Sequence, residues 1–371
     1  MNKDKALFRL EREKLLLTGE IPRLFMKYAL PGVAGLLFLG IQSVIDGIVL
    51  GRFVGANALA SVNLVLPCYS LISAFAIVMG IGGQTLVSIS LGRGDKQEAN
   101  NALRSVFVFL LGMSVVVSLV IFLSAGKIAS FLGANEVLLP DAVHYIRALV
   151  PFFPLLCAMF FGDYIIKAMG HPLYATSVMG MTVVLNIVLD LVFVAVLGWG
   201  VMGAGLATGI AFTMGACFNV PRLFSRHEVV AVQRGRYDRR LVWNAFYNGS
   251  SEGMSELSVA ITVFLFNITM MRYLGESGVA AFTAINYILF IGTTVFLGIS
   301  DGIIPIIGYN YGARQQERIK SILNKYQSQG NSLDGLKVQE AYADCEKALM
   351  LEAAKYNDVM ANAFQDLAPH K

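Results

Sequence analysis

Long apolar runs separated by short polar segments organise most of the chain. A membrane-spanning helix needs about 20 predominantly apolar residues, and the pattern predicts eight such helices. Their expected bounds are roughly 25–50, 60–90, 104–124, 142–169, 174–197, 201–221, 242–271 and 279–310. Prolines fall inside several of these runs and predict bent helices, because proline removes a backbone hydrogen bond. The expected fold class is all-α, and the chain is expected to be a polytopic membrane protein.

Composition agrees with this and argues against a soluble enzyme with a large core. Of the 371 residues, 56% are hydrophobic and 15% are charged, whereas soluble domains carry about 25% charged residues. The first 20 residues are charged and contain no apolar stretch of a cleavable signal peptide, so we expect an uncleaved N-terminus. The sequence contains no catalytic serine, zinc-ligand or nucleotide-loop motif, and we expect no enzymatic activity.

The distribution of lysine and arginine predicts the orientation. With the N-terminus inside, 25 of the 29 basic residues fall in segments on the inner side. The four on the outer side are Arg52, Lys127, Arg147 and Arg272. This asymmetry follows the positive-inside rule. It predicts a multi-pass protein of the cell inner membrane with both termini cytoplasmic.

An internal repeat with an offset of 220 residues aligns Gly82 with Gly302 and Gly92 with Gly312. The same offset aligns RFVGANALA with RYLGESGVA. An offset that carries six helices preserves orientation, so it indicates a parallel duplication of a six-helix unit. The expected domains are an N-lobe with six helices (1–225), a partial C-lobe with two helices (226–313) and a cytoplasmic polar helical tail (314–371).

The tail departs from the repeat, which predicts further membrane helices up to roughly residue 445. The chain is therefore expected to be truncated in its second lobe. From Val338 onward apolar residues recur at the spacing of a soluble amphipathic helix. This segment could pack on the cytoplasmic face, self-associate, or reflect a damaged or fused reading frame.

Charged residues inside the predicted spans are costly, at roughly 2.5–3.5 kcal/mol each near a helix centre. They are Asp46, Asp163, Lys167, Asp190, Glu252, Glu256 and Asp301. Because nearly all are acidic, a cavity that they line favours cations. Glu252, Glu256 and Asp301 are the candidates for a substrate cavity, although water or interhelical hydrogen bonds could also explain them. Asp163 and Lys167 are expected to form an ion pair, with the lysine extending toward the membrane interface.

Four polar residues from three helices are expected at one depth. A rise of 1.5 Å per residue places Asp46, Asp190 and Thr208 about 10 Å from the outer boundary, with Asn186 one turn deeper. Their oxygens could form the shell of a hard cation such as Na⁺, or the two carboxylates could share a proton. The alternative is that Asn186 and Thr208 only form interhelical hydrogen bonds.

The chain resembles the multidrug and toxic compound extrusion (MATE) family, and most closely its DinF-like bacterial branch. The resemblance covers residues 20 to about 320. The motifs that carry it are ALPGV (29–33), IDGIVLGRFVG (45–55), GGQTLVSISLGRGD (82–95), IIKAMGHPLYA (165–175), NIVLD (186–190), NGSSE (248–252) and GIIPIIGYNYGA (302–313).

The resemblance implies a cation-driven antiporter with two six-helix lobes around a central cavity. It implies a proton or sodium site at Asp46, Asn186, Asp190 and Thr208, and a helix bend at Pro31 linked to site occupancy. A coupling glutamate in the seventh helix would correspond to Glu252 or Glu256. A typical member has twelve helices, so this chain departs from the family by four.

The leading hypothesis is a cation-coupled (H⁺ or Na⁺) antiporter that exports organic cations or drugs, with function impaired if the truncation is real. Its expected partners are small organic cations and the lipid bilayer, without nucleic acid and without any cofactor beyond the coupling ion. One alternative is a lipid-linked precursor flippase of the same superfamily, which would need basic residues in its cavity. Another is a non-transporting membrane scaffold whose tail binds a partner.

Overall fold

The computed structural model describes residues 15–254, 294–295 and 297–333. The described residues fall in two units, one made of those up to 254 and from 294 to 316, the other of residues 317–333. Within these ranges the regular structure is helical and no strand is present. The all-α fold class predicted from the sequence is confirmed.

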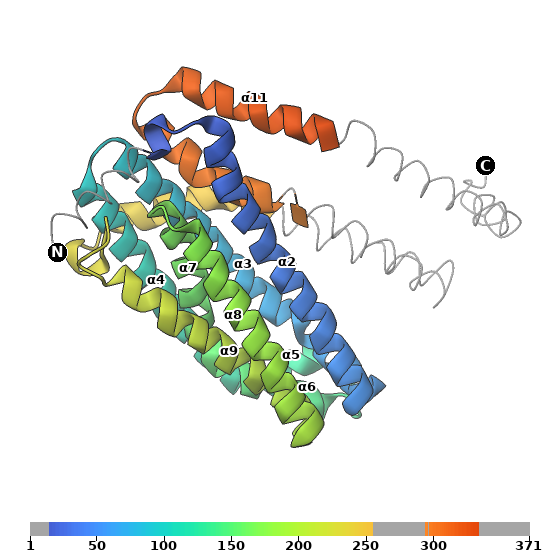
Figure 1. Ribbon diagram of the computed structural model, residues 1–371. Coiled ribbons are helices and arrows are strands. Elements are labelled where there is room, and N and C mark those ends of the chain that lie inside the picture. Colours follow the sequence, from blue (N-terminus) through green and yellow to red (C-terminus); the bar gives the residue numbers. More distant parts are fainter. Residues whose placement is uncertain (1–14, 255–293, 296, 334–371) are drawn as a thin grey trace, which may run out of the picture. The chain divides into compact units, whose positions relative to one another are not determined.

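The first unit is a bundle of long helices (Figure 1). Its elements are α2 (Ile21–Phe53), α3 (Ala56–Gly92), α4 (Lys96–Leu123), α5 (Ala125–Phe131), α6 (Leu139–Leu149), η1 (Val150–Phe152), α7 (Phe153–Ala168), α8 (Pro172–Asp190), η2 (Leu191–Val196), α9 (Gly200–Leu223) and η3 (Val232–Arg234). Residues 239–254 and 297–312 are also helical.

Six stretches are long and apolar enough to cross a membrane. They are Ile21–Phe53, Asn57–Gly92, Lys96–Leu123, Leu139–Ala168, Pro172–Val196 and Gly200–Leu223. The first six predicted spans are therefore confirmed. The seventh and eighth are described only in part, because residues 255–293 lie outside the described ranges.

Helix α7 is the most enclosed element and packs against α3, α4, α8 and α9. Helix α4 instead presents exposed apolar side chains along one side. These are Val108, Met113, Val115, Val116, Leu119, Val120 and Leu123. Since a helix in a bilayer needs an apolar outer face, this side is suited to lipid contact.

A proline interrupts the helix of the fourth span, and a neighbouring helix donates a hydrogen bond to a backbone carbonyl at this point. Pro154 has no N–H to donate to the carbonyl of Val150, four residues earlier, so that carbonyl accepts instead from the N–H of Phe153 in a 3₁₀ turn. The hydroxyl of Ser118 in α4 donates to that carbonyl at 2.5 Å. The chain forms the 3₁₀ turn η1 here and continues as α7. The bend is thereby accommodated without an unpaired backbone group at this carbonyl.

Close contacts between α3 and the helix 297–312 follow the same 220-residue offset as the sequence repeat. A methyl group on Gly92 would lie 2.1 Å from the carbonyl oxygen of Tyr309, and one on Gly312 would lie 2.1 Å from that of Ile89. The two contacts exchange under the offset, which is the relation expected of two helices crossing about a two-fold axis. The structure thus supports the repeat where both copies are described.

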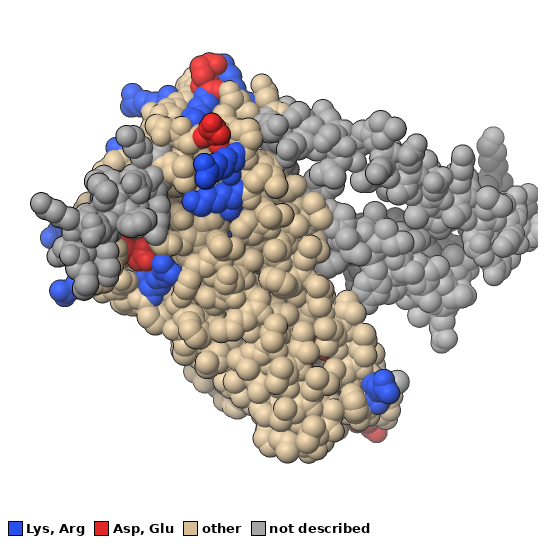
Figure 2. All heavy atoms as spheres, viewed as in Figure 1, with Lys and Arg blue, Asp and Glu red and all other residues tan. Residues whose placement is uncertain are grey.

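The ends of the bundle differ in charge. We call the end at which α3, α7 and α9 terminate the basic end, and the end at which α2 and α4 terminate the opposite end. Exposed basic residues at the basic end include Arg93, Lys96, Arg226, Arg234, Arg236, Arg239 and Arg240. Figure 2 shows the blue and red atoms gathered toward the ends, with tan side chains over the middle of the bundle.

The loop that follows α9 is fastened to α4 at the basic end. The backbone N–H groups of Ala231 and Arg236 donate to the side-chain oxygens of Asn100 and Asn101, both at 2.7 Å. The N–H of Asp238 donates to the Ser105 hydroxyl at 2.8 Å. This places the start of the helix 239–254 in a fixed position on α4.

The described residues of the second unit, 317–333, belong to helix α11 (Gln316–Leu333). This helix is not among the candidate membrane spans. It carries a pair one turn apart, in which Lys320 donates to Glu317 at 2.9 Å. The amphipathic segment predicted from Val338 onward lies outside the described residues.

Candidate functional site

The four predicted ion-site residues come together inside the bundle. Asp46 lies on α2, Asn186 and Asp190 on α8, and Thr208 on α9. The carboxyl groups of Asp46 and Asp190 lie close enough to interact electrostatically. The amide of Asn186 donates to the hydroxyl of Thr208 at 3.3 Å. Three helices therefore contribute to one polar cluster at a single level of the bundle.

This cluster is rich in buried oxygen acceptors. Asn186 is 0% exposed, Asp190 1% and Thr208 8%. Asp46 Oδ1, Asn186 Oδ1 and both carboxylate oxygens of Asp190 are buried and have no hydrogen-bond donor among the described residues. Buried polar atoms are nearly always hydrogen-bonded, and two adjacent carboxylates repel each other unless a proton or cation separates them. The oxygen set fits a hard cation such as Na⁺, which takes carboxylate, amide and hydroxyl oxygens.

Sequence reasoning missed two neighbours of the cluster. Gln42, one turn before Asp46 on α2, is buried and lies near Asp46, while its Oε1 lacks a donor in the described part of the chain. Tyr145 on α6 lies near enough to Asp46 and Asp190 to interact with both electrostatically. Gln42 could have been found from its four-residue spacing to Asp46, whereas Tyr145 has no signal in the sequence.

An apolar layer closes the cluster toward the opposite end. Leu50 follows Asp46 by one turn, Val194 follows Asp190 by one turn and Ala204 precedes Thr208 by one turn. All three belong to one buried hydrophobic cluster. The remaining members are Val49, Ala58, Val62 and Val201. Because apolar side chains exclude water, this layer separates the acidic pair from the surface at that end.

Asp190 stands at a change of helix type. Helix α8 ends at Asp190 and continues as the π-helix η2. π-Helical segments are rare and often occur at functional sites, because the wider turn alters the direction of nearby side chains. Here the change of helix type falls at Asp190, a residue of the polar cluster.

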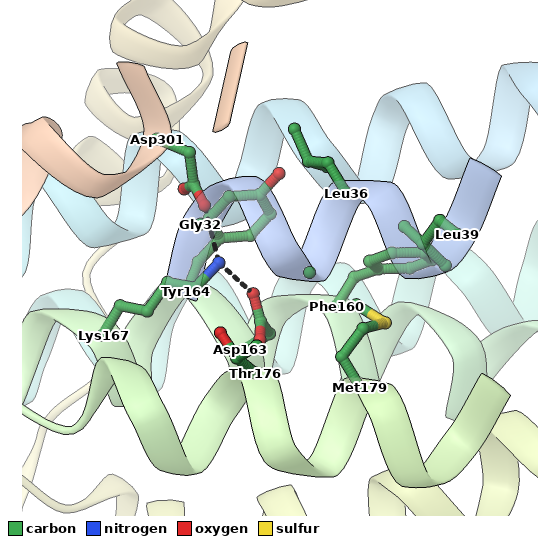
Figure 3. Close-up of a pocket in the computed structure, with 11 residues that line it drawn as sticks. Gly32, Leu36, Leu39, Phe160, Asp163, Tyr164, Lys167, Thr176, Met179 and Asp301 are labelled. Atoms are coloured by element: carbon green, nitrogen blue, oxygen red, sulfur yellow. Dashed lines mark hydrogen bonds and ion pairs between the residues drawn. The ribbon is translucent and has the colours of Figure 1, made fainter. Parts of the chain in front are cut away.

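A second buried charge group lies nearer the basic end. Lys167 Nζ on α7 is 2.6 Å from Asp163 Oδ2 and 2.6 Å from Asp301 Oδ2. Figure 3 shows the lysine reaching between the two carboxylates, with Tyr164 beside it. The predicted Asp163–Lys167 ion pair is confirmed. The prediction that Lys167 extends to the membrane interface is wrong, because Lys167 is only 6% exposed and is drawn inward to Asp301.

Two small cavities adjoin this group. One, of about 20 Å³, is lined by Asp163, Lys167 and Asp301 together with Thr176. The other, of about 70 Å³, is lined by Glu252, Ser300 and Asp301. Two of the three predicted substrate residues thus line one cavity. The third, Glu256, lies outside the described residues.

Pro31 lies within α2 and is linked to the helix that carries the ion site. The hydroxyl of Thr176 on α8 donates to the carbonyl of Pro31 at 2.8 Å. Asn186 and Asp190 lie farther along the same helix. A direct contact therefore joins the proline of α2 to α8. No feature of the sequence pointed to Thr176.

A third charged cluster fixes the basic end. The Glu228 carboxylate accepts hydrogen bonds from His171 at 3.1 Å and Arg222 at 2.8 Å. Arg222 also lies 3.3 Å from His171 Nδ1 and 4.0 Å from the ring centre of Tyr174. A neutral imidazole with its proton on Nε2 satisfies both histidine contacts. Burial opposes ionisation of Glu228, but the hydrogen bonds from His171 and Arg222 outweigh it and lower its pKa to about 2.

We expect Glu228→Gln to destabilise the protein at pH 7 but much less at pH 3. A carboxylate whose pKa is lowered from 4.5 to about 2 contributes stability above pH 4.5 and loses that contribution as the pH falls toward 2. The loss at pH 7 should be about 1–3 kcal/mol, seen as a lower melting temperature of the purified chain. Glu98→Gln is the control, because the Glu98 side chain is 39% exposed and 3.8 Å from Arg93. An equal effect of Glu228→Gln at both pH values would contradict the role of this carboxylate.

The membrane-spanning helices with their buried carboxylates, together with the family and relatives that this chain matches, identify it as a multi-pass membrane transporter, not an enzyme. The chain belongs to the MatE family, whose sequence profile matches residues 31–192 and 253–329.

Curated relatives include the multidrug export protein MepA of Staphylococcus aureus (strain MSSA476). It is 22% identical over 326 residues, which cover 86% of this chain and 71% of the relative. MepA of Staphylococcus haemolyticus (strain JCSC1435) shares the same identity and coverage.

Solved structures agree in fold. A MATE crystal structure in complex with MaD3S matches with a TM-score of 0.79 and 25% identity, covering 84% of this chain and 71% of that one. A MOP superfamily transporter from Pyrococcus furiosus matches with a TM-score of 0.78 and 25% identity, covering 84% of this chain and 70% of that one.

Proposed function

We propose that this chain is a cation-coupled antiporter that exports organic cations, including drugs, in exchange for H⁺ or Na⁺. The observation that carries the proposal is the buried Asp46–Asp190 pair, in which Asp46 Oδ1 and both Asp190 carboxylate oxygens have no donor among the described residues. A buried pair of carboxylates is costly unless a cation or proton accompanies it. The name of the Staphylococcus relatives, multidrug export protein, supports export of drugs.

The coupling ion would act by changing the charge of the pair. A proton or Na⁺ at Asp46 and Asp190 lowers the repulsion between α2 and α8, with Asn186 and Thr208 supplying further oxygens. A ligand shifts a conformational equilibrium only if it binds one state better than the other. The occupied site would therefore favour the arrangement in which these two helices lie close together.

Pro31 would transmit this change along α2. The Thr176–Pro31 hydrogen bond connects Pro31 to α8, so a shift of α8 on ion binding would alter the contact at this proline. Proline bends are tolerated in membrane helices because neighbouring groups satisfy the freed backbone. We propose that the bend at Pro31 changes with occupancy of the ion site.

The substrate would bind near the acidic cavities. Glu252 and Asp301 line one of them and Asp163 lines the other. Among the described residues that line them, Lys167 is the one basic residue, and it is already paired with two carboxylates. This balance favours organic cations over the pyrophosphate of a lipid-linked precursor. Glu256 remains a candidate for the same cavity.

The membrane orientation and the lobes follow from the same proposal. We propose that the basic end faces the cytoplasm, as the positive-inside rule favours, so that the acidic pair would lie in the outer half of the bilayer. We further propose the N-lobe at 1–225, the partial C-lobe at 226–313 and the cytoplasmic tail at 314–371.

Transport by the full chain in proteoliposomes tests the proposal. We expect efflux of tetraethylammonium when an inward gradient of H⁺ or Na⁺ is imposed, and no efflux when both ions are balanced. Vesicles without protein report the leak. Efflux that ignores both gradients, or none under any gradient, would contradict cation-coupled export. In the latter case, capture of a partner by the 330–371 peptide would favour the scaffold hypothesis.

A further inference from the structure

Lys167 occupies an unusual position for a lysine in a membrane helix. The side chains of Lys167, Asp163 and Asp301 are only 7%, 5% and 12% exposed. Asp163 and Lys167 are one turn apart on α7, whereas Asp301 belongs to the helix 297–312 (Figure 3). The lysine thus joins helices from the two copies of the repeat and shares one positive charge between two carboxylates.

Asp301 is the member of this group that also faces the larger cavity. Its Oδ2 accepts from Lys167, while its Oδ1 is buried and has no donor within the described ranges. It lines both cavities, and Glu252 lines the larger one with it. Asp301 therefore lies between the Lys167 ammonium group and the larger cavity, where a second cation could approach its carboxylate.

Carboxylates outnumber cations among the described residues that line the two cavities. Of the lining residues that the structure describes, Asp163, Glu252 and Asp301 provide three carboxylates and Lys167 provides the single cation. A carboxylate buried without a partner is strongly destabilising. Asp301 can therefore release Lys167 only when another cation takes its place, and Lys167 then remains with Asp163, to which it is bound on the same helix.

We propose that Lys167 is a tethered cation that competes with cationic substrate for Asp301. This inference rests on the proposed export of organic cations and deepens it by naming the residue that selects for charge. A neutral solute cannot take over the carboxylate and is rejected, whereas a compact ammonium group displaces the lysine. The apolar lining from Leu36, Ile77, Ile81, Leu297 and Ile304 suits the alkyl groups of such a cation.

The test is equilibrium binding of radiolabelled tetraethylammonium to the purified full chain. The informative variant is Lys167→Met/Asp163→Asn, which removes the tethered cation and its intrahelical partner while keeping the net charge unchanged. We expect it to bind tetraethylammonium about tenfold more tightly than the wild type, equivalent to ~1.4 kcal/mol. Asp163→Asn alone is the matched control and should not bind more tightly, because Lys167 is then left to Asp301.

The outcomes separate this inference from the proposed function. Wild-type binding without a gain in the double variant overturns the role of Lys167 alone. A gain that persists when Asp301→Asn is added also overturns it, because the competition would then not concern Asp301. Absence of binding in every variant contradicts the export of organic cations and this inference with it. Binding only when Lys167 is replaced supports the inference.

Discussion

Asp190→Asn is expected to reduce ion-coupled efflux of an organic cation to the leak of protein-free vesicles. Asparagine keeps the size of the side chain but neither binds a proton nor attracts Na⁺ as a carboxylate does. Asp190 is 1% exposed and lies beside Asp46, so water cannot take over the role of its carboxylate in binding the coupling ion. The measurement is tetraethylammonium efflux from proteoliposomes under an imposed H⁺ or Na⁺ gradient. Asp46→Asn should give the same result.

Asp141→Asn is the matched control for this prediction. Asp141 lies in the first turn of α6, and its loss should cost only the ~0.3–1 kcal/mol of a helix-dipole interaction. Efflux by this variant should remain close to that of the wild type. Wild-type efflux by both Asp46→Asn and Asp190→Asn would show that the acidic pair does not couple ion binding to transport.

Gly82→Ala is expected to lower the stability of the folded chain by at least about 3 kcal/mol, near the upper end of overpacking costs. A methyl group at Gly82 in α3 would lie 1.8 Å from the carbonyl oxygen and 2.5 Å from the carbonyl carbon of Ala245. Both atoms belong to the backbone of the helix 239–254, so relief requires the two helices to separate. Small residues permit such close helix contacts in membranes. The melting temperature and folded yield of detergent-purified protein measure the effect.

Gly112→Ala provides the comparison, because a methyl group there would meet no atom within 4 Å. Alanine favours helix by about 1 kcal/mol relative to glycine, so this variant should match or slightly exceed the wild type. Equal melting temperatures for both variants would mean that α3 and the helix 239–254 do not pack as described.

The six spans and the polar cluster could be predicted because membrane physics leaves a strong signal in the sequence. A run of apolar residues must be helical to satisfy its backbone. A carboxylate inside such a run stands out, and helix rise gives its depth. Asp46, Asp190 and Thr208 could therefore be placed at one level before any contact was known. The 220-residue offset likewise anticipated the paired approaches of Gly92 and Gly312.

Contacts of single side chains could not be predicted in the same way. Lys167 was expected at the interface because a lysine near a helix end usually extends there. Its second partner, Asp301, is 134 residues away in sequence, and only the approach of the two helices brings them together. The Thr176–Pro31 hydrogen bond and the position of Tyr145 depend on helix packing for the same reason.

The break at η2 was also absent from the sequence prediction. The apolar run around Asp190 reads as one uninterrupted helix, because α- and π-helical turns have no distinct residue pattern here. The structure separates α8 from η2 at Asp190 itself. The local geometry of the candidate ion site is thus a property of the packed bundle.

Cation binding to the purified chain tests the central claim most directly. Binding of ²²Na⁺ and uptake of protons would be measured for the wild type and for the Asp46→Asn/Asp190→Asn variant, with Asp141→Asn as control. The account predicts that the wild type and the control bind one Na⁺ or one proton per chain that the double variant does not bind. Equal Na⁺ and proton binding by all three proteins would contradict an ion site at Asp46, Asn186, Asp190 and Thr208.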